Sequence, residues 1–169
     1  KKYNKIKINE SNIIILGITG FVGTALKKRF NTLKINYKGY SRKELDLTDI
    51  SSINNKEKKF NNNDIVVFIS AEAPCKNEEM YKRNLSMVIN FNKIIKNKNL
   101  KKIIYISSDA VYSDSKNLIN ENWEKKPDNF HGQMHLEREN ILTNMCKLRN
   151  IPLVILRPTL IYGPEDTHN

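Results

Sequence analysis

The chain has 169 residues, of which 39% are hydrophobic and 8% aromatic, a composition that favours one globular domain with a buried core. No apolar run approaches the roughly 20 residues of a membrane-spanning helix, which excludes that kind of membrane protein. The net charge of +11 comes from basic residues spread along the whole chain without interleaved aromatic residues, a pattern that does not favour nucleic-acid binding.

The cysteines and the N-terminal segment indicate the cellular compartment in which the protein is expected. Cys75 and Cys146 lie far apart and lack CxxC spacing, so two free thiols in a reducing compartment are expected. Residues 1–10 are basic and polar, and the apolar core of a signal peptide does not follow them. We therefore expect a cytoplasmic protein.

Short runs rich in isoleucine and valine alternate with polar stretches of helical length. They predict strands at 13–16, 65–69, 103–106 and 152–156, and weaker strands at 35–40 and 44–47. Helices are predicted at 21–33, 50–60, 78–97 and 131–148. The order indicates an α/β fold, a doubly wound parallel sheet of about six strands with helices on both faces. The long irregular segment 112–130 is predicted to be a functional loop.

The first predicted strand leads into residues 17–23 (GITGFVG), and a predicted helix follows at once. A diphosphate needs backbone N–H groups at a helix N-terminus, and glycine lets the chain approach it without a Cβ clash. The spacing is GxxGxxG rather than GxGxxG, but the strand-to-helix setting is the one that a dinucleotide site requires. Dinucleotide contacts are predicted for Gly17, Thr19, Gly20, Phe21, Val22 and Gly23.

This glycine segment resembles that of the extended short-chain dehydrogenase/reductases, the NAD-dependent epimerase/dehydratase family, which have a Rossmann fold. Residues 64–71 are similar to the family's fourth strand, 107–112 (SSDAVY) to its SSxxVY strand end and 157–164 (RPTLIYGP) to its RPxxxYGP segment. Asn84 matches an asparagine in the helix after the fourth strand. The resemblance implies further cofactor contacts from Ser70, Ala71, Asn84, Ser107 and Pro158.

The end of the second predicted strand bears on the choice of cofactor. NAD binders usually carry an acidic residue there, about 20 residues past the glycines, to accept from the ribose 2′-hydroxyl. This chain has Ser41 and Arg42 instead, and an arginine beside a hydroxyl can hold a 2′-phosphate. NADP is therefore predicted over NAD. Asp46, followed by Leu47, resembles the family's adenine-facing aspartate.

The family's chemistry uses a serine or threonine after the fifth strand, and a tyrosine and a lysine four residues apart on one helix. Four residues apart on a helix are neighbours, so the lysine can hold the ribose and lower the tyrosine's pKa. Ser108 occupies the serine position here. Residues 131–139 (HGQMHLERE) are similar to YGxxKxxxE, with His131 and His135 at the two key positions.

Three interpretations of this HxxxH pair are open. In the first, His131 is the general acid/base, since imidazole titrates near neutral pH, and His135 holds the ribose. In the second, the site binds the cofactor but has lost the redox step. In the third, the two histidines bind a metal, which is the least favoured because neither an HExxH glutamate nor a further ligand cluster is visible.

The resemblance implies an NAD(P)-dependent epimerase, dehydratase or reductase that acts on a nucleotide-linked sugar by hydride transfer, with Ser108, His131 and His135 as its catalytic residues. The alternative is an NAD(P)-binding protein without redox catalysis, a sensor or a partner subunit. We expect residues 1–169 to form the cofactor-binding domain, with the substrate-binding portion beyond residue 169. A homodimer is compatible with the resemblance, because the family often dimerises through helices near strands four and five.

Overall fold

A computed structural model describes residues 12–51 and 53–163. In these ranges it contains a five-stranded sheet, all parallel, in the order β2-β1-β3-β4-β5. The strands are β1 (Ile13–Leu16), β2 (Tyr37–Tyr40), β3 (Ile65–Phe68), β4 (Lys102–Ile106) and β5 (Leu153–Leu156). The predicted parallel α/β sheet is confirmed, with five strands rather than about six.

Four α-helices and one short 3₁₀ helix connect the strands within the described residues. They are α1 (Phe21–Leu33), α2 (Ile53–Glu57), α3 (Glu78–Ile94), η1 (Asp109–Val111) and α4 (Phe130–Arg149). The α2 helix is shorter than the predicted 50–60, and α3 ends before the predicted residue 97. None of these helices has both the length and the apolar character needed to cross a membrane.

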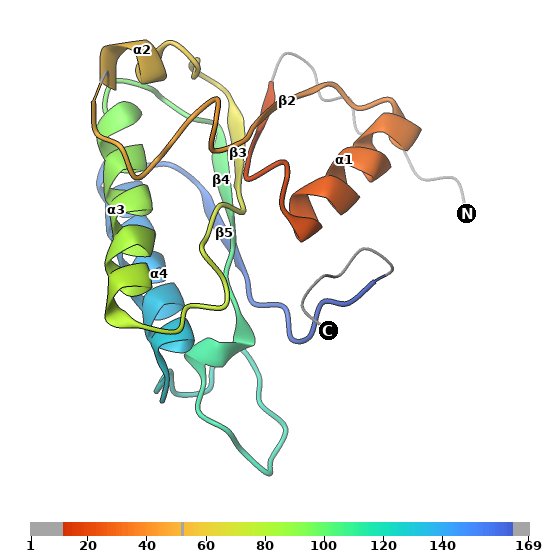
Figure 1. Cartoon of the computed structure of the whole chain (residues 1–169), viewed down its shortest axis with the longest axis vertical. Coiled ribbons are helices and arrows are strands. Elements are labelled where there is room, and N and C mark those ends of the chain that lie inside the picture. Colours follow the sequence, from red (N-terminus) through yellow and green to blue (C-terminus); the bar gives the residue numbers. More distant parts are fainter. Residues whose placement is uncertain (1–11, 52, 164–169) are drawn as a thin grey trace.

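The helices lie on both faces of the sheet, as Figure 1 shows, with α1 on one face and α3 and α4 on the other. From β1 the chain passes through α1 to β2 on one side, and β3 then pairs with β1 on its other side. The winding direction therefore reverses between β2 and β3, and parallel sheets bind ligands at the carboxyl ends of the strands beside such a switch point.

Two apolar layers hold the helices to the sheet. The smaller one joins Ile13, Ile15 and Val67 to α1. The larger one lies under α3 and α4, where Phe91 is fully buried and its ring packs against Phe60 and Phe68 with centroid distances of 5.8 and 5.1 Å. These packed aromatic rings fix α3 against β3.

The strand predicted at 44–47 does not form. Ser41 donates from its backbone and its hydroxyl to the Glu44 carboxylate, and the backbone N–H of Leu45 donates to the Ser41 carbonyl, which makes a turn. Leu45 and Leu47 are nevertheless buried in the larger core. The alternating pattern that suggested a strand therefore arises because two leucines anchor a loop.

Replacing Phe91 with alanine should lower the free energy of unfolding by about 3–5 kcal/mol, because the cavity left between Phe60 and Phe68 cannot close fully. Leu148→Ala is the control, since Leu148 is 86% exposed and should cost less than about 0.5 kcal/mol. Urea denaturation of both variants measures the difference. Equal midpoints would contradict the assignment of Phe91 to the core.

Candidate functional site

The bend after β1 contains two glycines that have no room for a side chain. Gly17 has φ of +91°, and a Cβ there would lie 2.8 Å from the backbone nitrogen of Ser70. A Cβ on Gly23 would overlap the carbonyl oxygen of Gly17. Because both Cβ atoms are missing, the carboxyl ends of β1 and β3 meet closely and α1 packs directly on the bend.

Gly20 is different, because it faces open space at the start of α1. A Cβ there would meet nothing closer than the Gly17 carbonyl oxygen at 3.6 Å. Gly20 is the N-cap of α1 in an extended conformation; no side chain caps the helix, and its first turn contains no acidic residue. The first N–H groups of a helix have no partners within the helix and lie at the positive end of its dipole, so this position suits an anion.

A cleft opens beside this bend at the switch point. Many of the residues predicted to bind the cofactor line it, namely Gly17, Thr19, Gly20, Arg42, Asp46, Leu47, Ser70 and Ala71. Its remaining lining residues are Leu45, Ile69, Glu72 and Met87, which the sequence reasoning missed. Leu45, Ile69 and Glu72 are each adjacent to a predicted position, whereas Met87 carries no pattern that could have indicated it.

The other predicted cofactor residues lie outside this lining. Phe21, Val22 and Gly23 form the first turn of α1. The hydroxyl of Ser41 is held by Glu44 in the turn after β2, at 2.7 Å. The Ser107 hydroxyl donates to the buried carboxylate of Glu139, also at 2.7 Å, and Pro158 lines a second cleft.

Asn84 is fully buried on α3 and acts on the cleft through Glu72. Its side-chain oxygen accepts from the backbone N–H of Glu72 at 2.9 Å, and its side-chain nitrogen donates to the Glu72 carbonyl at 3.0 Å. The amide thus satisfies both backbone polar groups of one residue in the cleft wall. Asn84 fixes the position of that wall.

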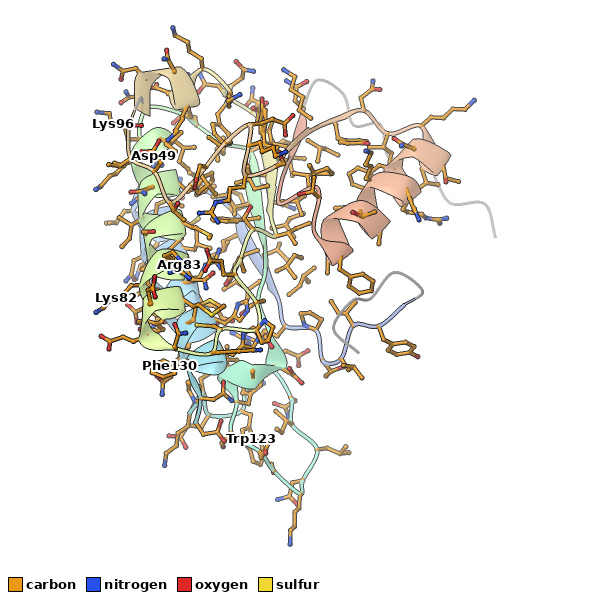
Figure 2. The ribbon with its side chains drawn as sticks, in the orientation of Figure 1. Asp49, Lys82, Arg83, Lys96, Trp123 and Phe130 are labelled. Carbon is orange, nitrogen blue, oxygen red and sulfur yellow. The ribbon has the colours of Figure 1, made fainter. Side chains whose placement is uncertain are left out.

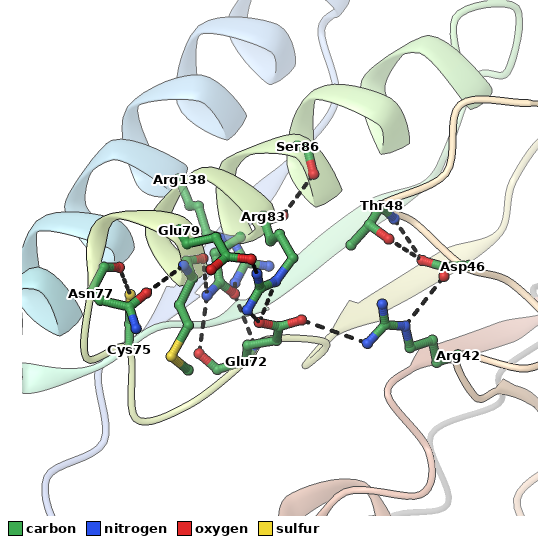
Figure 3. A network of polar contacts seen from close by, with 12 residues as sticks. Arg42, Asp46, Thr48, Glu72, Cys75, Asn77, Glu79, Arg83, Ser86 and Arg138 are labelled. Atoms are coloured by element: carbon green, nitrogen blue, oxygen red, sulfur yellow. Dashed lines mark hydrogen bonds and ion pairs between the residues drawn. The ribbon is translucent and has the colours of Figure 1, made fainter.

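An ion network crosses the same wall (Figure 3). The Glu72 carboxylate accepts from Arg83 Nε at 2.8 Å and lies 3.6 Å from Arg42 Nη1. Arg42 Nε also lies 3.2 Å from the Asp46 carboxylate. Burial acts against ionisation of Asp46, but hydrogen bonds from Thr48 and the charge of Arg42 outweigh it and lower the pKa of the carboxyl.

The predicted catalytic groups lie at the same edge of the sheet, after β4 and at the start of α4. Ser108 caps η1, and its hydroxyl lies 3.2 Å from the Asp109 carboxylate. His131 is half-buried in the first turn of α4, and its Nδ1 accepts from the backbone N–H of Cys75 at 3.3 Å. Burial lowers the pKa of His131, although Asp109 acts in the opposite direction. A neutral imidazole is the result.

His135 lies in a different setting from the one predicted for a ribose-holding residue. Its side chain is 5% exposed, and its Nδ1 pairs with the buried Tyr105 hydroxyl at 2.7 Å. Burial, followed by the charges of Arg138 and His131, lowers the pKa of His135 to about 2. A buried neutral imidazole that is already bonded does not present a charged donor to either cleft.

The two histidine rings meet edge to face, with their centroids 4.7 Å apart. Within residues 12–51 and 53–163, no three His, Cys, Asp or Glu side chains form a group that could hold a metal ion.

Arg138, one turn after His135, is fully buried. Its guanidinium donates to the Ser70 carbonyl at 2.6 Å and lies over the rings of Phe68 and Tyr105, 5.0 and 5.2 Å from their centroids. The hydrogen bond to Ser70 ties α4 to the wall of the first cleft. A permanent positive charge therefore lies beneath the site, three residues along the helix from the position where the family pattern has lysine.

A second cleft lies between η1, the loop 113–129 and the segment after β5, and its lining includes Asp109, Tyr112, Glu121 and Arg157. Arg157 binds the buried Glu139 carboxylate through Nε and Nη2, each at 2.8 Å. Figure 2 shows Trp123 on this loop and Phe130 at the start of α4, at the same end of the molecule. The predicted irregular loop is confirmed.

A parallel doubly wound sheet with a glycine bend at its switch point defines the Rossmann class of α/β domains. Residues 13–169 match the NAD dependent epimerase/dehydratase family, and the chain belongs to this family.

Individual proteins of this kind are similar to the chain over most of its length. The dTDP-D-glucose 4,6-dehydratase of Dictyostelium discoideum is 27% identical over 208 residues, which cover 96% of this chain and 46% of that protein. The fold matches the Thermus thermophilus UDP-glucose 4-epimerase in complex with NAD, with a TM-score of 0.80, 18% identity and coverage of 93% and 58%. It also matches the Campylobacter jejuni GDP-mannoheptose C4 reductase with NADP bound, with a TM-score of 0.77, 21% identity and coverage of 90% and 49%. The chain spans about half the length of the curated relatives it matches.

The depressed pKa of His135 makes stability depend on pH. The unfolded chain binds a proton at the ordinary value near 6.5 and the folded chain does not, so stability is present above pH 6.5 and falls as the pH drops toward 2. Between pH 7 and pH 5, His135 should reduce the free energy of unfolding by about 2 kcal/mol. Urea denaturation at both pH values, compared with His135→Asn, isolates this effect. The same pH dependence in the variant would contradict it.

Proposed function

We propose that this chain is the NAD(P)-binding part of an epimerase, dehydratase or reductase that acts on a nucleotide-linked sugar. The observation that carries the proposal is the start of α1 at Gly20, where a helix without a side-chain cap opens onto the first cleft. The family match and the similarity to a dTDP-D-glucose 4,6-dehydratase support the reaction class.

The first cleft suits a dinucleotide along its length. The open space at Gly20 leaves room for a diphosphate beside the N–H groups of α1. Leu45, Leu47 and Met87 line the cleft with apolar atoms, which suit an adenine ring. Arg42 and Asp46 line the same cleft and supply polar groups for a ribose.

The reacting sugar is proposed to lie between Ser108 and His131, with the rest of the substrate in the second cleft. Bound nicotinamide supplies the hydride acceptor or donor. Ser108 holds the sugar oxygen by a hydrogen bond, and neutral His131 takes the proton from it or returns it. Nδ1 accepts from the backbone N–H of Cys75, so the neutral ring carries its own proton on Nε2. His131 therefore takes the sugar proton on Nδ1, after its bond to Cys75 opens.

His135 and Arg138 position this site in the proposal. His135 contacts the His131 ring and is held by Tyr105, so it orients the imidazole that moves the proton. Arg138 supplies a fixed positive charge. The alternative function is dinucleotide binding without redox catalysis. The burial of His135 motivates it, because this buried neutral ring does not supply the charge of the family's lysine. The family match does not favour the alternative.

Gly20→Asp separates binding from folding. Aspartate is a good N-cap and fits the extended backbone at Gly20, so the melting temperature should be unchanged or slightly higher. Its carboxylate would occupy and repel the diphosphate position, so the Kd for dinucleotide should rise at least about 100-fold. Calorimetric titration and thermal unfolding measure the two effects. Unchanged affinity in a folded variant would refute the proposed diphosphate site.

His131→Ala in the full-length protein should lower kcat by about 10²- to 10⁴-fold, since it removes the proton-transfer group. The lowered pKa of His131 means that the acid limb of kcat/KM lies below pH 6.5, the ordinary imidazole value. In His131→Tyr this limb should move to higher pH, because a phenol titrates near 10. Steady-state rates from pH 5 to 9 measure these effects.

Two outcomes would decide against a catalytic His131. Turnover by His131→Ala at the unaltered rate would remove His131 from the mechanism. Dinucleotide binding by the unaltered protein, without turnover of any nucleotide sugar, would favour the non-catalytic alternative.

A further inference from the structure

We infer that Glu72 makes the first cleft select a dinucleotide with a free 2′-hydroxyl on its adenosine ribose, and reject one with a 2′-phosphate. The cofactor would then be NAD rather than NADP. The inference rests on the proposed dinucleotide site and names its preferred ligand. It reverses the preference that Arg42 suggests in the sequence.

The 2′-position falls among Arg42, Asp46 and Glu72. In this class of fold the ribose lies at the end of the strand that follows the glycine-bearing helix. That strand is β2, and Arg42 lies two residues beyond its last residue, Tyr40. Arg42 and Asp46 line the cleft from this side, and Glu72 lines it from the segment after β3.

Glu72 is held in place by two contacts that do not involve Arg42. Buried Asn84 bonds both its backbone N–H and its carbonyl. Arg83 on α3 binds its carboxylate through Nε and Nη2, each at 2.8 Å (Figure 3). The side chain is 21% exposed, so its charge is partly shielded from water. Its carboxylate therefore stays in the cleft wall when a ligand enters.

Arg42 is held far less firmly. Its side chain is 65% exposed, and its contacts to Asp46 and Glu72 are surface ion pairs of little net strength. Arg42 can turn toward a 2′-phosphate, but Asp46 would then lose its cation, and Glu72 would keep only Arg83, which it shares with Glu79. The preference for NAD over NADP therefore depends on the fixed carboxylate of Glu72. It does not depend on the strength of the ion pairs that Arg42 makes.

The charge balance of this wall disfavours a phosphate. The network contains the guanidinium groups of Arg42 and Arg83 and the carboxylates of Asp46, Glu72 and Glu79, so it carries one net negative charge. A 2′-phosphate would add between one and two further negative charges. A 2′-hydroxyl can instead donate to the Glu72 or Asp46 carboxylate.

Titration calorimetry with NAD and NADP, each binding to the full-length protein, tests the inference. The unaltered protein should bind NAD at least about tenfold more tightly than NADP, because the carboxylates repel the added phosphate. Glu72→Gln keeps the size of the side chain and one acceptor oxygen. It should tighten NADP binding about tenfold and change NAD binding less than about threefold.

Glu79→Gln is the matched control. It removes the same charge from a carboxylate that also pairs with Arg83, but Glu79 is 82% exposed and does not line the cleft. The ratio of the dissociation constants for NADP and NAD should be the same in this variant as in the unaltered protein. Thermal unfolding of both variants identifies any loss of fold.

The outcomes separate the inference from the function on which it rests. Two results would overturn the inference but not the dinucleotide site. One is that the unaltered protein binds NADP as tightly as NAD. The other is that Glu72→Gln changes the ratio of the two dissociation constants no more than Glu79→Gln does. Absence of binding by both dinucleotides overturns the proposed function and the inference with it.

Discussion

The close approach of the ends of β1 and β3 is the constraint on which the site depends. Gly17 can adopt its left-handed conformation beside the Ser70 backbone because it has no Cβ. Gly23 allows α1 to start directly above the same bend. With both contacts in place, the first N–H groups of α1 border the cleft that Ser70 and Ala71 line from the segment after β3. A larger residue at Gly17 or Gly23 would separate these elements.

The walls of the site are fixed by polar contacts from the helices behind them. Asn84 on α3 bonds the backbone of Glu72, and Arg138 on α4 bonds the carbonyl of Ser70. Both side chains are fully buried, which makes their hydrogen bonds costly to break. The two helices therefore position the lining of the cleft, while the strands supply only the starting points of its loops.

Local signals predicted much of this arrangement. The bounds of β1 and α1 follow from an apolar run and a glycine bend within one short segment, so the sequence was sufficient there. The strand predicted at 44–47 was wrong because a loop anchored by Leu45 and Leu47 has the same alternation of apolar and polar residues as a strand. The place of Glu72 in the cleft depends on tertiary contacts with α3, and the burial of His135 depends on its partner Tyr105 from β4. No sequence pattern records either contact.

The depth of Arg138 has a consequence for how the site responds to its surroundings. Mobile ions screen charges at the surface but have little access to a guanidinium enclosed by aromatic rings. Its field at Tyr105 and His135 is therefore almost independent of ionic strength, whereas the exposed charge of Arg42 weakens as salt is added. The two ends of the site thus differ in salt sensitivity, with a constant potential near the proposed reaction centre and an adjustable one near the proposed adenosine position.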